Sequence, residues 1–192
     1  KLMQYLHDHF EAMDFIFDLV KSNRNLSKSF IKELHQLITQ NQDYTEAIDS
    51  LGQRINVKLL KGEFKKFDNN PKRDDGTIFL YCPPIQVENE IDNLINAYNK
   101  LSEQNINPII VASWVHHAFT QIHPFQDGNG RIARLLASLI LIKNGLLPFT
   151  VKRGDKVKYI KALESADRGN PQELVSFFAL YFLLLAVSIK KH

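Results

Sequence analysis

The chain has 192 residues, of which 44% are hydrophobic and 23% are charged, which is usual for a single soluble globular domain with a sizeable core. Its 24 basic and 21 acidic residues leave a net charge of +3, too small to indicate nucleic acid as a partner without a concentrated basic stripe. The locally basic stretch at residues 58–66 is typical of a solvated face, and the alternative is a phosphate-contacting surface.

The sequence contains no recognisable targeting segment. It opens KLMQYLHDHFEAMDF, which has charges and helical periodicity but no small-residue cleavage site, so a signal peptide is not predicted. The missing initiator Met indicates a fragment, and the single cysteine, Cys82, favours a reducing cytoplasm. The apolar run at residues 174–189 is shorter than the ~20 residues that cross a bilayer. We predict a buried terminal helix there and no membrane span.

A helical pair is predicted for residues 1–40. Apolar residues recur at helical spacing from Leu2 onward, and Ser27 is placed to cap a second helix. The polar stretch that follows contains two segments that look extended, GEFKKF and TIFLY, both within residues 62–84. A small β-hairpin is therefore predicted for residues 62–84.

Helices are predicted for most of the remaining chain. Apolar spacing indicates one helix after CPPI, and two more in residues 109–144 that flank a loop beginning at His123. Two further helices are expected in residues 155–190. The sequence thus predicts a single domain over residues 1–192, mostly α-helical, with one small hairpin.

The loop between the two central helices reads HPFQDGNGRIAR and contains a glycine-flanked turn. Gly128, Asn129 and Gly130 lie where the next helix is predicted to begin. Glycines let backbone N–H groups approach a ligand closely, and the N-terminus of a helix favours negative charge. Asn129 adds a side-chain donor. The turn therefore predicts a phosphate site.

The charged residues of this loop indicate a nucleotide reaction. Arg131 and Arg134 lie three residues apart, so both are expected to project from one helix face and clamp a polyphosphate. Asp127 beside such positive charge is explained if it holds Mg²⁺ on the phosphates. His123 can accept a proton near neutral pH. Since no Ser, Cys or Lys lies between residues 123 and 134, the attacking hydroxyl should come from the substrate.

The same loop resembles the signature of the Fic (filamentation induced by cAMP) family, H-x-F-x-[D/E]-G-N-G-R-x-x-R. The match holds at all eight defined positions: His123, Phe125, Asp127, Gly128, Asn129, Gly130, Arg131 and Arg134. Flanking segments extend the resemblance over most of residues 1–180. It implies a Fic-type helical bundle with a β-hairpin flap over the active-site loop. It also implies a protein adenylyltransferase, which transfers AMP from ATP to a Ser, Thr or Tyr hydroxyl of a target protein and releases pyrophosphate.

The resemblance assigns a role to each motif residue. His123 would deprotonate the target hydroxyl, and Asp127 would hold Mg²⁺. The α-phosphate would lie against Asn129 and the amides of Gly128 and Gly130.

Both arginines take phosphate roles in the same resemblance. Arg131 and Arg134 would bind the β- and γ-phosphates. Doc-type relatives, which transfer a phosphoryl group, replace the second motif glycine with lysine and lose the downstream arginine. Because this chain keeps Gly130 and Arg134, AMP transfer is favoured over phosphoryl transfer.

The resemblance also implies partners. The family flap captures a target segment by strand addition, and residues 62–84 match it in position. Many members carry an inhibitory helix, [S/T]-x-x-x-E-[G/N], whose Glu pairs with the second motif arginine. Here Ser29 and Glu33 have the spacing, but Leu34 follows them. We therefore expect an uninhibited Arg134, with the inhibitor supplied by a segment outside this chain or by a partner antitoxin. The oligomeric state stays open.

Alternatives use the same residues. A non-catalytic nucleotide-binding or regulatory module would keep the anion site but would not need His123. Removal of AMP from a modified protein, or another nucleotide-derived transfer, would use the same loop. A zinc site on His123 and Asp127 is a further alternative, but no third donor is obvious. His116 and His117 are interpreted as hydrogen-bonding core residues rather than metal ligands. Three hydroxyl groups are candidates for self-modification: Tyr98, Tyr159 and Ser138.

Overall fold

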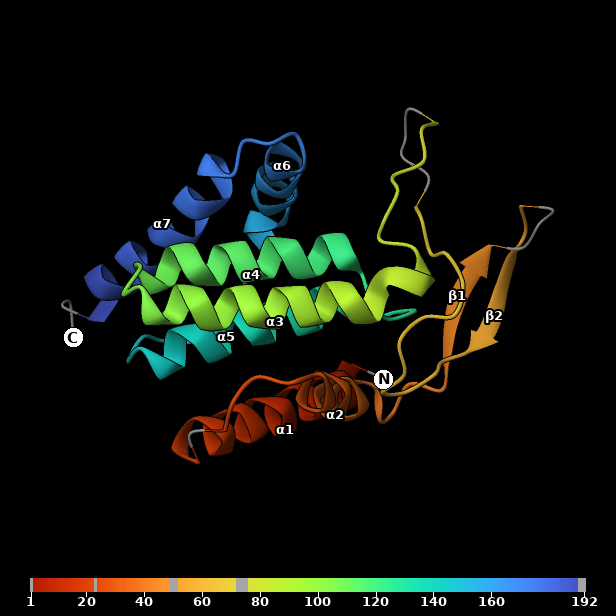
Figure 1. Cartoon of the computed structure of the whole chain (residues 1–192), viewed down its shortest axis with the longest axis horizontal. Coiled ribbons are helices and arrows are strands. Elements are labelled where there is room, and N and C mark those ends of the chain that lie inside the picture. Colours follow the sequence, from red (N-terminus) through yellow and green to blue (C-terminus); the bar gives the residue numbers. More distant parts are fainter. Residues whose placement is uncertain (1, 23, 49–51, 72–75, 190–192) are drawn as a thin grey trace.

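The computed structural model describes residues 2–22, 24–48, 52–71 and 76–189 (Figure 1). These residues form seven α-helices and one two-stranded sheet, which confirms the mostly α-helical class. The elements are α1 (Leu2–Lys21), α2 (Lys28–Thr39), β1 (Tyr44–Ile48), β2 (Arg54–Lys58), α3 (Val87–Glu103), α4 (Pro108–Ile122), α5 (Asn129–Lys143), α6 (Lys156–Asp167) and α7 (Gln172–Ile189).

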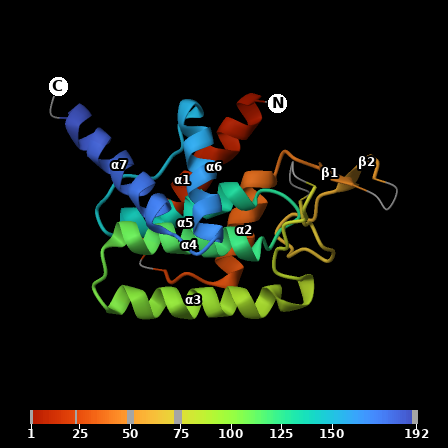
Figure 2. The ribbon, with the colours of Figure 1, turned by 90° about the horizontal axis from the view of Figure 1, so that it is seen from above.

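The other helices are arranged around the central pair α4 and α5 (Figures 1 and 2). Ten of the 15 residues of α5 are buried, so this helix lies at the centre of the core. Helices α1 and α2 pack together against one side of α5, while α3 and α7 pack against α4. Among the described residues, none of the helices has the length and apolarity that a membrane span requires.

The N-terminal capping prediction is confirmed. Ser27 has an extended backbone and its hydroxyl accepts a hydrogen bond from Phe30 N at 3.2 Å. The buried face of α2 then carries Phe30, Ile31, Leu34 and Ile38 into the core. This face matters for function because its last turns lie against the motif loop.

The hairpin is present, but its predicted location was wrong. Strand β1 pairs antiparallel with β2, with Tyr44 opposite Lys58 and Ile48 opposite Arg54. Within residues 62–71 and 76–84 the structure has no regular strand, and Ile78 makes only an isolated bridge. We call residues 62–84 the flap segment.

Backbone hydrogen bonds join the flap segment to the motif loop and to the last turn of α4. Lys65 N donates to Pro124 O at 2.7 Å, and Cys82 N donates to Gln121 O at 3.3 Å. Within the flap segment itself, Phe79 N donates to Pro71 O at 3.0 Å. The described parts of the flap segment therefore contact the motif loop and α4 without forming a regular ladder.

Candidate active site

The motif loop begins where α4 ends. His123 follows Ile122 with a left-handed backbone (φ 49°, ψ 57°), and its N–H still donates to Phe119 O at 3.0 Å. A left-handed residue with a side chain is uncommon and turns the chain sharply. The turn lies at the end of the bundle that carries the hairpin, opposite α7 (Figures 1 and 2).

Asn129 closes the loop from inside. Its Oδ1 accepts from Phe125 N at 2.9 Å, its Nδ2 donates to Phe125 O at 2.7 Å, and only 2% of the residue is exposed. Phe125 itself is fully buried. The side chain of Asn129 was expected to face a phosphate, but here it satisfies the buried backbone of Phe125.

Gly128 makes the sharp entry to α5. Its φ is +80°, a conformation that favours glycine, and an added Cβ would lie 3.2 Å from Ile38 Cδ1, which is a tight contact. The first bond inside α5 runs from Ile132 N to Gly128 O at 3.0 Å. The amides of Asn129 and Gly130, which precede it, thus have no acceptor within the helix and face its N-terminal end. This is the geometry of an anion site.

His123 has a defined tautomer. Its Nδ1 lies 3.3 Å from Thr120 O, and because a carbonyl can only accept, Nδ1 carries the proton. Nε2 is left with a lone pair. Burial is the main cause that lowers the pKa of His123 to about 4, with the charge of Lys65 adding to it, so the ring is neutral near pH 7. The imidazole therefore has the form that a general base needs.

Tyr81 of the flap segment packs on this imidazole. The two rings are stacked with centroids 3.8 Å apart and planes within 12°. Stacking fixes the ring orientation without using either ring nitrogen. The contact also shows that the flap segment reaches the predicted base.

A cavity of about 410 Å³ joins three of the predicted residues, His123, Gly130 and Arg134. An added Cβ on Gly130 would lie 3.5 Å from Arg134 Nη1, so this guanidinium folds back over the first turn of α5. The opposite wall comes from α6 and the segment before it, with apolar Val151, Ile160 and Leu163 and basic Lys152, Arg153 and Lys156. The cavity thus combines a base, an anion site, a cation and an apolar wall.

Asp127 and Arg131 lie on the α2 side instead. Asp127 Oδ2 accepts from Gln42 Nε2 at 2.6 Å and from Thr45 Oγ1 at 3.3 Å, and Oδ1 accepts from Gly128 N at 2.6 Å. Burial alone would raise the pKa of Asp127, but the bonds from Gln42 and Gly128 and the charge of Arg131 outweigh it and hold the pKa below its usual value. Asp127 is therefore an ionised carboxylate.

Arg131 does not share a face with Arg134, contrary to the prediction. Its Nη1 donates to Ile38 O at 2.7 Å and its Nη2 donates to Gln42 Oε1 at 2.8 Å. The guanidinium thus ties α5 to the end of α2. One glutamine amide, that of Gln42, holds both Asp127 and Arg131, a role that the sequence did not reveal.

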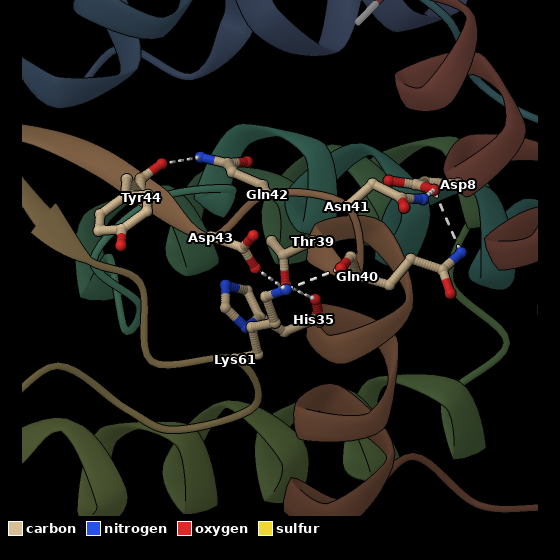
Figure 3. A network of polar contacts seen from close by, with 9 residues as sticks. All are labelled: Asp8, His35, Thr39, Gln40, Asn41, Gln42, Asp43, Tyr44 and Lys61. Carbon is tan, nitrogen blue, oxygen red and sulfur yellow. Dashed lines mark hydrogen bonds and ion pairs between the residues drawn. The ribbon is translucent and has the colours of Figure 1, made fainter.

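The end of α2 that receives these contacts is itself fixed by polar contacts (Figure 3). Lys61 Nζ donates to Gln40 O at 2.7 Å and to Asp43 Oδ1 at 2.9 Å. Asn41 Nδ2 donates to the buried Asp8 at 2.6 Å. The polar segment after α2 is therefore a well-connected support for the motif loop.

The other histidines of α4 have structural surroundings. His116 is fully buried, its Nε2 lies 2.9 Å from the hydroxyl of Tyr159, and burial lowers its pKa to about 3. His117 Nε2 lies 3.0 Å from Asp167 Oδ1. Within the described residues no group of three or more His, Cys, Asp or Glu is placed to hold a metal, so a metal at Asp127 needs further ligands from a substrate or water.

Two other sequence-level candidates can be placed. Glu33, which has the spacing of an inhibitory glutamate, forms a two-bond pair with Arg24 at 3.1 and 3.2 Å rather than with Arg134. The hydroxyl-bearing residues considered for self-modification are 2–7% exposed, which makes all three poor acceptors: Ser138, Tyr159 and Tyr98.

Comparison with known proteins gives the same family as the motif. The model of the Fic/DOC family matches residues 25–141, more than half of the chain. A Fido domain-containing protein from Dictyostelium discoideum is 42% identical over 91 residues, which cover 46% of this chain and 63% of that protein. A probable protein adenylyltransferase from Aquifex aeolicus is 38% identical over 145 residues, covering 72% of this chain and 43% of that protein.

Solved structures show the same fold. A Fic domain containing signaling protein from Bacteroides thetaiotaomicron aligns with a TM-score of 0.78 at 25% identity, over 91% of this chain and 66% of that chain. Fic-1 from Caenorhabditis elegans aligns with a TM-score of 0.75 at 23% identity, over 98% of this chain and 52% of that chain. The chain spans 28–63% of the length of the first curated relatives that it matches.

Proposed function

The chain belongs to the Fic/DOC family, and on that premise we propose that it transfers AMP from ATP to a Ser, Thr or Tyr hydroxyl of a target protein. One observation carries the proposal. The neutral His123, with a lone pair on Nε2, lines the same cavity as Gly130 and Arg134. A base, an anion site and a cation around one cavity are what transfer from a nucleotide to a hydroxyl requires.

In the proposed reaction the target hydroxyl gives its proton to His123 Nε2, and its oxygen attacks the α-phosphorus. The bond from that phosphorus to the oxygen bridging to the β-phosphate breaks, and pyrophosphate leaves. The amides at the start of α5 stabilise the charge that develops on the attacked phosphate. Arg134, folded over that turn, pairs with the terminal phosphates.

Asp127 is the residue that we propose for Mg²⁺. It is ionised, and its two oxygens accept three hydrogen bonds in total, which leaves about one of its four lone pairs for a cation. One carboxylate together with phosphate oxygens and water is a usual environment for Mg²⁺. Bound there, the ion would neutralise charge on the phosphates. Asn129 and Arg131 support this arrangement indirectly, by fixing the loop and its contact with α2.

We propose that the target segment adds to the flap segment as a strand. Ile78 is 62% and Leu80 is 74% exposed, while Phe79 and Tyr81 are half-buried. This alternation is that of an extended chain with one face turned outward. One solved Fic domain of the same fold, at 17% identity and a TM-score of 0.57, is in complex with adenylylated Cdc42, a protein acceptor. A cytoplasmic location and an inhibitor supplied from outside this chain complete the proposal.

The test uses ATP labelled at the α- or the γ-phosphate, incubated with the protein and candidate target proteins. We expect α-label on protein, no γ-label on protein, and loss of transfer in His123→Ala. His7→Ala, on the exposed side of α1, is the matched control and should transfer normally. Protein-bound γ-label would indicate phosphoryl transfer instead. ATP binding without transfer would indicate a non-catalytic module, and release of AMP from labelled protein would indicate de-AMPylation.

A further inference from the structure

His35, a residue of α2 outside the motif, is joined to the motif loop by its imidazole. The residue is fully buried. Its Nε2 lies 3.1 Å from Asp127 O, and its Nδ1 lies 2.8 Å from Gly62 N. A carbonyl can only accept and an amide N–H can only donate, so Nε2 carries the proton and Nδ1 the lone pair. Both ring nitrogens are thus used, one on each of two separate segments.

The contact with Asp127 fixes the peptide group that leads into α5. The carbonyl of Asp127 and the N–H of Gly128 belong to one planar peptide group, so holding the oxygen also holds the N–H, which points the opposite way and donates to Asp127 Oδ1 at 2.6 Å. His35 also stacks on Phe125, with ring centroids 3.9 Å apart and planes within 5°. The imidazole therefore restrains the loop at two points, one before and one at the phosphate-binding turn.

The contact with Gly62 holds the first residue of the flap segment. Gly62 has φ +73°, and an added Cβ would lie 2.6 Å from Gln36 Cγ, so glycine is needed for the chain to approach α2 this closely. From Gly62 the chain continues to Lys65, whose N–H bonds to Pro124 O. The flap segment is thus bonded to His35 at its first residue, Gly62, and to the motif loop three residues later, at Lys65.

We propose that His35 is a positioning residue that couples the flap segment to the phosphate-binding turn, by joining Gly62 N to the carbonyl that sets the direction of the Gly128 amide. The inference rests on the proposed function, in which the flap segment binds the target and the turn binds the nucleotide. Target binding at the flap and nucleotide seating at the turn then depend on one side chain. A core residue that only stabilises the fold would not link the two.

Three substitutions separate the contacts. His35→Phe keeps an aromatic ring for the stack on Phe125 but removes both hydrogen bonds. His35→Gln places an amide where Nε2 lies and can keep the bond to Asp127 O. His35→Asn places an amide oxygen near Nδ1 and can keep the bond to Gly62 N. Ile91→Ala, a fully buried change on α3, is the control for loss of stability alone.

The measurements are ATP affinity by calorimetry and kcat and KM for AMP transfer, at a temperature where circular dichroism shows each variant folded. We expect His35→Phe to weaken ATP binding and lower kcat by about 10-fold or more, as misplaced groups at a reacting centre do. His35→Gln should recover ATP affinity to within about 3-fold of wild type. His35→Asn should recover KM for the target but not ATP affinity. Ile91→Ala should keep wild-type kinetics.

Two results would overturn the inference: wild-type ATP affinity in folded His35→Phe, or equal losses in His35→Gln and His35→Phe. If the wild-type protein bound ATP but transferred no AMP, the proposed function would fail. The role of His35 would then be decided by ATP affinity alone, with the same two results counting against it.

Discussion

Acidification should destabilise this protein between about pH 7.5 and about pH 5.5, because three imidazoles are held in neutral form, His35 and His116 fully buried and His123 partly exposed. Burial is the main cause that lowers the pKa of His35 and His123 to about 4 and that of His116 to about 3. In the unfolded chain each has the ordinary pKa of about 6.5. Below that value protons bind the unfolded chain and not the folded one. The contribution of these neutral rings to the free energy of unfolding is therefore fully present above about pH 6.5. It decreases as the pH falls toward the pKa values of the folded protein.

The expected loss is large. At pH 5.5, about one unit below the unfolded pKa, keeping one ring neutral costs between about 1 and about 2 kcal/mol. Three rings together cost roughly 4 kcal/mol, against a total stability of about 5–15 kcal/mol for a typical domain. The lowered pKa of Asp127 does not contribute in this interval, because the stability that it provides is lost only when the pH falls below 3.8, the ordinary pKa of the carboxyl group.

Urea unfolding followed by far-ultraviolet circular dichroism at about pH 7.5, 6.5 and 5.5 measures this loss of free energy directly. The matched variant is His116→Phe, which replaces a ring that packs against Phe149 and Phe178 by another aromatic ring. Its free energy of unfolding should depend less on pH, by about 1 kcal/mol over the same interval. A wild-type protein equally stable at both ends of the interval, or a variant with unchanged pH dependence, would refute the reasoning.

Four substitutions in the motif test the tasks that the structure gives to its residues. Asn129→Ala should lower the free energy of unfolding by about 2–4 kcal/mol, because both backbone groups of Phe125 lose their partner in a buried place; a loss below about 1 kcal/mol in urea unfolding would contradict this role. Gly128→Ala should lose about 1–3 kcal/mol through positive φ and contact with Ile38, read by the same assay. Arg131→Ala should lower stability by about 1–3 kcal/mol, whereas Arg134→Ala should leave stability within about 0.5 kcal/mol and weaken ATP binding in calorimetry; the reverse pattern would exchange their roles.

The helices, and the position of the motif between two of them, could be predicted from the sequence because their signals are local. Apolar spacing and the cap at Ser27 depend only on neighbouring residues, and both are found in the structure. The hairpin was misplaced for the opposite reason. The extended segments at residues 62–84 looked like a strand pair, but the amides of Lys65 and Cys82 bond to Pro124 and Gln121, which are distant in sequence.

The residues that hydrogen-bond to the motif could not be predicted from the sequence either. His35 is a single histidine on the apolar face of α2, and nothing in its neighbours shows that Gly62 and Asp127 lie on either side of it. Gln42 stands in a polar stretch that reads as an ordinary loop. Only the fold brings both residues to the motif. By contrast, His123, Gly130 and Arg134 were predicted to share one site, and they line one cavity.

Some motif residues face the cavity and others stabilise the conformation of the loop. The residue types alone could not show which is which. A loop that turns sharply between two buried helices carries backbone N–H and C=O groups that water cannot reach, and each must find a partner. Asn129 bonds to the backbone of Phe125, and Arg131 bonds to the carbonyl of Ile38 in the last turn of α2. A polar side chain that the sequence offers for ligand binding is thus already hydrogen-bonded to the backbone in the folded protein. The residues left to face a nucleotide are those whose backbone or side chain the loop does not need.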